Sequence, residues 1–195
     1  IYLFTSTIIN ILEGQQMDMD FEKEMKIKID NYLKMIRLKT ATLFASCLKT
    51  GAITANTNVD NQDYIYQFGI NIGMAFQIQD DLFDVYGNTQ TTGKTNGQDI
   101  ASNKKTYLSV KALEIAQKED LKTLKYYFSK TKFDFAEKFN TVKGLYDKYG
   151  IRQLAEKQIQ FYYQEAYKNI EALNLSEERT SPLIEFIKQL MYRSF

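Results

Sequence analysis

The sequence predicts an all-α protein organised as a single domain over residues 1–195. Apolar residues recur at the spacing of helices along most of the chain, whereas no stretch alternates convincingly between apolar and polar residues as a strand does. The only proline, Pro182, stands near the start of the last expected helix, where proline is tolerated. With 44% apolar residues, the chain is long enough to bury a substantial core.

Helix start and stop signals divide the chain. Asp30 and Asp60 are placed to cap helices, and Gly51 is a plausible helix end. Gly69 and Gly73 predict a close helix crossing, and we expect either a close approach or a bend at Gly14. The expected helices cover residues 1–17, 30–51, 60–86, 107–117, 121–128, 135–149, 151–173 and 183–192, with one long polar loop over 88–103.

Composition excludes several classes of function. The formal net charge of +1 provides no overall basic field for nucleic acid or an anionic membrane. Residues 1–12 are too short and too polar to span a bilayer. The absence of histidine removes histidine bases and histidine metal ligands. The single Cys47 excludes an internal disulfide, favours a reducing compartment such as the cytoplasm, and is expected to be buried.

Three carboxylates interrupt an apolar helical pattern at residues 76–87. At 3.6 residues per turn, Asp80 and Asp84 lie one above the other, and Asp81 lies about 100° round the helix. Like charges at this spacing destabilise a helix by roughly 0.2–0.5 kcal/mol unless a cation lies between them. Mg²⁺ fits, because it takes oxygen ligands from one or two carboxylates and from substrate phosphates.

A solvated helix face is the simpler interpretation of such a motif taken alone. The apolar helix before it and the glycine-rich polar loop after it favour a metal and phosphate site instead. This loop carries Gly93-Lys94, but the full GxxxxGK[ST] pattern of a P-loop is absent. Lys39-Thr40 interrupts the apolar face of an earlier helix, where a lysine that only reaches out to solvent is the simpler alternative.

Taken together, the ordered motifs resemble those of the trans-isoprenyl diphosphate synthases, the polyprenyl synthetase family. The resemblance covers nearly all of the chain and implies a helical bundle of the isoprenoid-synthase type around a central cavity. The aspartates resemble the second aspartate-rich motif of that family. The motifs that carry the resemblance are Gly14-Gln15 with Asp18, Lys39-Thr40, Phe76-Gln77 with Asp80, Asp81 and Asp84, Gly93-Lys94, Asp99-Ile100 and Asn103-Lys104.

The resemblance implies a prenyltransferase that condenses an allylic diphosphate with isopentenyl diphosphate after Mg²⁺-assisted ionisation to a carbocation. Three Mg²⁺ ions would bind together with the substrate diphosphate, and the protein would be a homodimer. The family's residue roles fall on Asp80, Asp81 and Asp84 as metal ligands, on Lys39, Lys94, Lys104 and Gln77 for substrate binding, and on Lys39, Thr40, Gln77 and Lys94 for catalysis.

The family's first aspartate-rich motif is absent from this sequence. We therefore expect residues 1–195 to be the C-terminal portion of a synthase, inactive without the upstream part. One alternative is a catalytically silent or truncated partner subunit of an active synthase. A terpene cyclase is a second alternative, because it also ionises allylic diphosphates with Mg²⁺. A helical adaptor without enzymatic activity is a third, which would leave the polar motifs unexplained.

Overall fold

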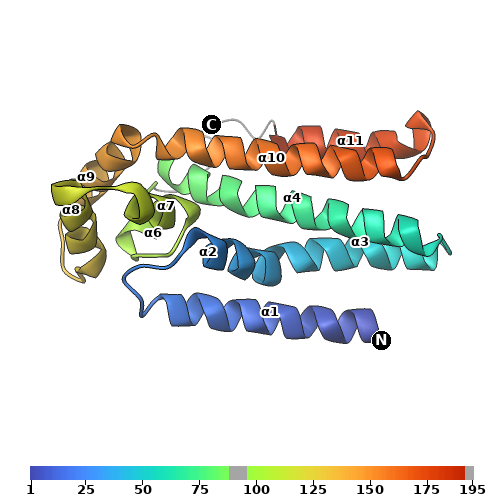
Figure 1. Ribbon diagram of the computed structural model, residues 1–195, viewed down its shortest axis with the longest axis horizontal. Coiled ribbons are helices and arrows are strands. Elements are labelled where there is room, and N and C mark those ends of the chain that lie inside the picture. Colours follow the sequence, from blue (N-terminus) through green and yellow to red (C-terminus); the bar gives the residue numbers. More distant parts are fainter. Residues whose placement is uncertain (88–95, 192–195) are drawn as a thin grey trace. The chain divides into compact units, whose positions relative to one another are not determined.

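The computed structural model describes residues 1–87 and 96–191, and every regular element within these ranges is helical (Figure 1). The predicted all-α class is therefore confirmed. The elements are α1 (Tyr2–Phe21), α2 (Ile29–Ile36), the π-helical turn η1 (Arg37–Ala41), α3 (Thr42–Thr54), α4 (Val59–Tyr86), α6 (Gln98–Ala101), α7 (Tyr107–Ile115), α8 (Lys118–Ser129), α9 (Phe135–Lys148), α10 (Ile151–Ala172) and α11 (Glu177–Met191).

Contacts along the chain group the described residues into two compact units. The first unit contains Ile1–Gln15, Met35–Gln77 and the described residues from Gln158 onward. The second unit contains Gln16–Lys34 and Ile78–Lys157. Helices α1, α2, α4 and α10 contribute residues to both units. The single-domain organisation expected from the sequence stays a prediction.

Small residues allow close helix packing in the first unit. A Cβ atom added at Gly73 would lie 2.5 Å from Ala41 Cα, and Gly69 lies equally tightly against Ala45. This confirms the predicted crossing, in which α4 packs against η1 and α3 (Figure 1). At Gly14 the close approach is confirmed, since an added Cβ would lie 2.5 Å from Lys39 N, and α1 continues past it to Phe21.

The second unit is built around α7, α8 and α9, which contact one another (Figure 1). Thr106 begins α7 with a capping box, in which its side chain accepts from Ser109 N and its own N–H donates to Ser109 Oγ. Asp134 caps α9 by accepting from Glu137 N at 2.8 Å. The buried apolar side chains of this unit include Ile78, Leu82, Leu108, Leu113, Leu124 and Val142.

Several predicted helix ends differ from the structure. Asn58 accepts from Asn61 N at 2.8 Å, so it caps α4 in place of Asp60. Gly51 does not end its helix, because α3 continues to Thr54. Asp30 lies in the first turn of α2 instead of capping it. The expected loop over 88–103 contains the short helix α6.

The last helix begins earlier than its apolar pattern predicted. Helix α11 starts at Glu177, which places Pro182 inside it. Proline has no N–H for the carbonyl of Glu178, and Ser181 Oγ donates to that oxygen at 3.0 Å instead. The local serine therefore makes the proline tolerable within the helix.

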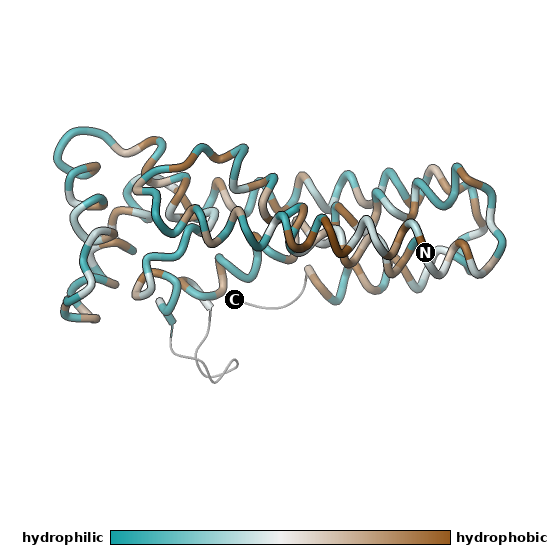
Figure 2. Tube along the Cα trace, turned by 90° about the horizontal axis from the view of Figure 1, so that it is seen from below, coloured by the Kyte–Doolittle hydropathy of each residue, from teal (hydrophilic) through white to brown (hydrophobic). Residues whose placement is uncertain are grey.

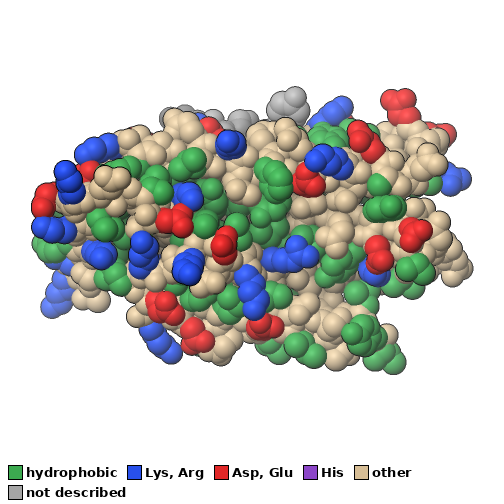
Figure 3. All heavy atoms as spheres, in the orientation of Figure 1, with side chains coloured by type: hydrophobic (Ala, Val, Ile, Leu, Met, Phe, Trp, Pro, Cys, Tyr) green, Lys and Arg blue, Asp and Glu red, His purple; other side chains and the backbone are tan. Residues whose placement is uncertain are grey.

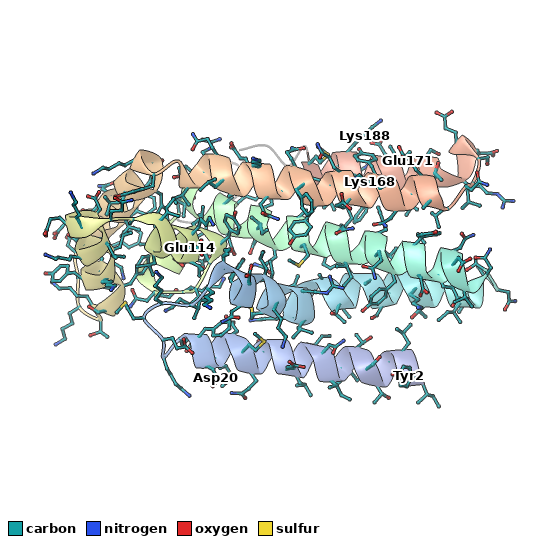
Figure 4. The ribbon with its side chains drawn as sticks, in the orientation of Figure 1. Tyr2, Asp20, Glu114, Lys168, Glu171 and Lys188 are labelled. Carbon is teal, nitrogen blue, oxygen red and sulfur yellow. The ribbon has the colours of Figure 1, made fainter. Side chains whose placement is uncertain are left out.

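The surface departs from expectation at one residue in particular. Cys47 is exposed on α3 and not buried, because the buried face of that helix carries Thr42, Ala45 and Ser46 instead. Most helices carry both hydrophobic and hydrophilic residues (Figure 2). Charged side chains of both signs lie among hydrophobic ones on the face drawn in Figure 3. Lys168, Glu171 and Lys188 are exposed on α10 and α11 (Figure 4). No helix among the described residues is long and apolar enough to cross a membrane.

Candidate functional site

The C-terminal end of α4 places its three aspartates in different environments. Asp80 is exposed, Asp84 is half-buried, and the side chain of Asp81 is only 1% exposed. The helical period explains the difference, since Asp81 shares its face with the buried residues Ile78 and Val85. The three carboxylates are therefore suited to different tasks.

Asp81 is held by donors from two other helices of the second unit. Its Oδ2 accepts a hydrogen bond from Tyr32 Oη on α2 and another, at 2.7 Å, from Tyr107 N at the start of α7. Burial raises the pKa of the Asp81 carboxyl to about 7, although both hydrogen bonds act in the opposite direction. The tyrosine rings meet edge to face with centroids 6.3 Å apart. Asp81 thus joins α2, α4 and α7.

Asp84 binds the backbone of residues 97–99, where α6 begins. Its two carboxylate oxygens accept from Gln98 N at 3.1 Å and Asp99 N at 3.0 Å, and its backbone carbonyl accepts from Gly97 N at 2.6 Å. Gly97 has a φ of +87°, a conformation that favours glycine. Burial and the charge of Asp99 raise the pKa of Asp84. Asp84 therefore fixes the first turn of α6 against the end of α4.

A lysine completes this cluster. Lys104 Nζ lies 3.1 Å from Asp99 Oδ1, and Lys104 N donates to Asp99 O at 3.0 Å. Burial would lower the pKa of Lys104, but the carboxylates of Asp99, Asp81 and Asp80 outweigh it and raise that pKa. Lys104 thus stays charged beside the aspartates.

A second cluster lies in the first unit. Lys39 and Thr40 belong to the π-helical turn η1, a kind of turn that is frequent at functional sites. The widened turn is supported by Thr42, whose N–H and hydroxyl both donate to the carbonyl of Arg37. Thr40 Oγ1 donates to Gln77 Oε1 at 3.0 Å. The structure therefore brings two of the predicted catalytic side chains into direct contact.

The predicted site residues thus fall into two described groups. Thr40 contacts Gln77, with Lys39 in the same turn as Thr40, and Asp80, Asp81, Asp84 and Lys104 gather in the second unit. Lys94 lies outside the described residues. Sequence reasoning missed the tyrosines that bind Asp81, because Tyr32 fits an apolar helical position and gives no local sign of its partner 49 residues away.

The donor chemistry fits Mg²⁺ held jointly with a substrate. Among residues 1–87 and 96–191, no three acidic or cysteine side chains are arranged to hold a metal ion by themselves. Mg²⁺ does not require such a cage, because one or two carboxylates and substrate phosphates commonly suffice. Exposed Asp80 and half-buried Asp84 could supply those carboxylates, whereas the burial of Asp81 favours a positioning role.

Comparison with known proteins identifies the family of the chain. A family model described as polyprenyl synthetase matches residues 1–145. A geranylgeranyl diphosphate synthase of Sulfolobus acidocaldarius is 33% identical over 194 residues, which cover 98% of this chain and 57% of that protein. A short chain isoprenyl diphosphate synthase of Methanothermobacter thermautotrophicus is 40% identical over 116 residues, or 60% of this chain and 36% of that protein.

Solved structures give the same result. A crystal structure of a geranylgeranyl pyrophosphate synthase matches all of this chain and 60% of its own, with a TM-score of 0.91 and 38% identity. The geranylgeranyl pyrophosphate synthetase of Pyrococcus horikoshii matches 99% of this chain and 58% of its own, with a TM-score of 0.90 and 28% identity. The chain has the all-α fold of these synthases and spans little more than half the length of each.

Proposed function

The chain belongs to the polyprenyl synthetase family, and from this premise we propose that its protein is a trans-prenyltransferase. The proposed reaction condenses an allylic diphosphate with isopentenyl diphosphate. The relatives support this proposal, since their names describe synthases of geranylgeranyl and other isoprenyl diphosphates. Because the chain spans only part of their length, the proposed activity is that of the whole protein.

One structural observation supports the proposal in addition to the similarity to the relatives. Asp84 binds the first turn of α6, and that short helix carries Asp99, which pairs with Lys104. Carboxylates for a cation and an ammonium group for a phosphate are thus fixed in one network of the second unit. A solvated helix face has no need of such a network.

We assign the residues the following roles. Asp80 and Asp84 hold Mg²⁺, and Asp81 keeps the helix that carries them in place. When bound, Mg²⁺ offsets the negative charge that the departing diphosphate acquires. The ammonium groups of Lys104, Lys39 and Lys94 bind the diphosphate.

The remaining steps require few protein groups. The allylic C–O bond breaks with its electron pair on the diphosphate, and the double bond of isopentenyl diphosphate attacks the allylic cation. The attack leaves a condensed cation, which loses a proton to the released diphosphate as the new double bond forms, so no histidine base is needed. The oxygens of Thr40 and Gln77, already in contact, are suited to face the cation as dipoles without acting as nucleophiles.

The test begins with the protein as it occurs in its source. Its intact mass is compared with the 22.8 kDa of this chain, and its oligomeric state is measured by sedimentation. The protein is then incubated with labelled isopentenyl diphosphate, allylic diphosphates of several lengths and Mg²⁺. We expect longer prenyl diphosphates that disappear when the metal is chelated, and we expect residues 1–195 alone to be inactive.

The alternative subunit role gives a different result. A silent partner subunit would show no turnover by itself and would change the turnover of an active synthase with which it co-purifies. A terpene cyclase would release diphosphate and hydrocarbon from an allylic diphosphate without consuming isopentenyl diphosphate. Either outcome would overturn the proposed prenyl transfer.

A further inference from the structure

A lysine is buried in the second unit, away from the aspartates. Lys138 on α9 has a relative exposure of 0%. Its Nζ donates to Asn103 Oδ1 at 2.6 Å and to the carbonyl of Ala101 at 3.2 Å, and it lies 4.1 Å from the centroid of the Phe133 ring. Burial lowers the pKa of Lys138. Among the described residues, no carboxylate forms an ion pair with it.

Fold stability alone does not account for this residue. Burying an ammonium group costs several kcal/mol, and neutral acceptors offset that cost only in part. An apolar side chain of similar size is often as stable or more stable at such a position. Lys138 therefore points to a requirement other than stability at the atoms it contacts.

The acceptors of Lys138 lie directly before Lys104. Ala101 is the last residue of α6, and Asn103 has a φ of +60°, a left-handed conformation that asparagine adopts more readily than most residues other than glycine. Asn103 also donates from Nδ2 to the carbonyl of Lys130 at 3.2 Å, so its side chain bridges two lysines of the chain. The backbone conformation that leads into Lys104 is thus fixed by the side chain that binds Lys138.

Helix α9 holds the other end of the same segment through its next residue. The ring of Phe139 packs directly against Gly97, where no Cβ could be accommodated. The N–H of Gly97 also donates to the backbone carbonyl of Asp84. Neighbouring residues of α9, Lys138 and Phe139, therefore contact the two ends of the segment that runs from Gly97 to Asn103, directly before Lys104.

We propose that Lys138 is a positioning residue, whose ammonium group fixes Asn103 and the end of α6 so that Lys104 is held beside Asp99, ready to bind the diphosphate of the substrate. This inference rests on the proposed function in so far as Lys104 binds diphosphate. The positioning of Lys104 itself is independent of the reaction and can be measured separately.

The first experiment compares Lys138→Met with Lys143→Met in the whole protein. Methionine keeps the apolar stem and removes the ammonium group. Lys143 is the matched control, because it lies on the same helix and pairs with Asp147 instead of with the α6 segment. The readouts are amide hydrogen exchange of residues 101–104, acetylation of Lys104 followed by mass spectrometry, and the affinity for inorganic pyrophosphate with Mg²⁺ by calorimetry.

We expect Lys138→Met to speed exchange at residues 101–104 and acetylation of Lys104, and to weaken pyrophosphate binding about tenfold, as loss of a supporting partner commonly does. Lys143→Met should leave all three values close to the wild type. A merely structural lysine would lower global stability without changing Lys104 in the folded protein, and that result overturns the proposal. A wild type that does not bind pyrophosphate counts against the proposed function, while exchange and acetylation still decide the role of Lys138.

A second variant tests the route through Asn103 and serves if Lys138→Met does not fold. Asn103→Gly removes the nearer acceptor but keeps the positive φ accessible. It should also speed acetylation of Lys104, and the double variant should differ little from either single one. Effects that simply add, or an Asn103→Gly protein with wild-type acetylation, would show that Lys138 does not position Lys104 through Asn103.

Discussion

The hydroxyl of Tyr32 on α2 donates a hydrogen bond to the buried carboxylate of Asp81 on α4, 49 residues further along the chain. The side chain of Asp81 is only 1% exposed, so it depends on the protein and not on solvent for its hydrogen bonds. The backbone N–H of Tyr107 donates to the same oxygen at 2.7 Å. Within the aspartate motif, this residue therefore has the strongest structural role.

Replacing Tyr32 with phenylalanine should destabilise the fold. The change removes one donor from a buried acid, which should lower the free energy of unfolding by about 2 kcal/mol. Urea denaturation followed by circular dichroism measures the change. Tyr126→Phe is the control, since Tyr126 is half-exposed and its hydroxyl accepts from Lys130 at the surface. Equal stabilities of the two variants would contradict the role given to Tyr32.

The glycine crossing of the first unit gives a second prediction. Gly73→Ala would place a Cβ 2.5 Å from Ala41 Cα, so the helices must separate, and we expect a loss of about 1–3 kcal/mol in unfolding free energy. Gly51→Ala should instead raise stability by about 0.5–1 kcal/mol, because Gly51 lies within α3 and nothing is within 4 Å of its added Cβ. The opposite signs are read from paired thermal or urea melts. A neutral Gly73→Ala would contradict the tight crossing.

Features set by local spacing could be predicted from the sequence. The helical class, the crossing at Gly69 and Gly73, and the gathering of carboxylates at one end of a helix all follow from residue periods. The contact of Thr40 with Gln77 did not follow from any spacing, because the residues are 37 positions apart and η1 widens its turn through the side chain of Thr42. The resemblance to a known family identified both residues without showing that they touch.

Features that depend on which helix face is covered could not be predicted. Cys47 fits the apolar pattern of its helix, yet Cys47 is exposed. The polar side chain of Ser46 beside it is buried instead, where it accepts a hydrogen bond from Thr7. Lys138 occurs among charged residues in the sequence and gives no sign of its burial. Long-range packing decides both positions, and no local pattern encodes it.

A buried tyrosine without a partner gives the next prediction. The side chain of Tyr146 is 1% exposed, and its hydroxyl has no hydrogen-bond partner among the described residues. Tyr146→Phe removes that unpaired group while keeping the ring, so the free energy of unfolding should stay the same or rise by up to about 1 kcal/mol. Denaturation in urea beside Tyr32→Phe makes the comparison. A loss of more than about 1 kcal/mol would mean that a water molecule satisfies this hydroxyl.

The stability of the protein should depend on pH through Lys138. Burial lowers the pKa of this lysine in the folded state below the 10.5 of an ordinary lysine. Below both values the folded protein bears the cost of a buried charge, and between them the unfolded chain binds more protons, so stability rises with pH. The gain should be absent from Lys138→Met. Unfolding free energies of both proteins are compared from neutral pH toward 10.5, and parallel curves would contradict the prediction.

Asp80 should matter for turnover and not for folding. Its side chain is exposed at the end of α4, so Asp80→Asn should leave helical content and unfolding free energy close to the wild type. Loss of a carboxylate that holds Mg²⁺ should reduce the turnover of the whole protein about 10²-fold or more. Asp63→Asn is the matched control, because Asp63 lies on the same helix and pairs with Lys49 at the surface. Near-normal turnover of Asp80→Asn, or an equal loss in Asp63→Asn, would remove Asp80 from the metal site. Asp81→Asn, by contrast, should lower the free energy of unfolding, because Asp81 is buried and Asp80 is exposed.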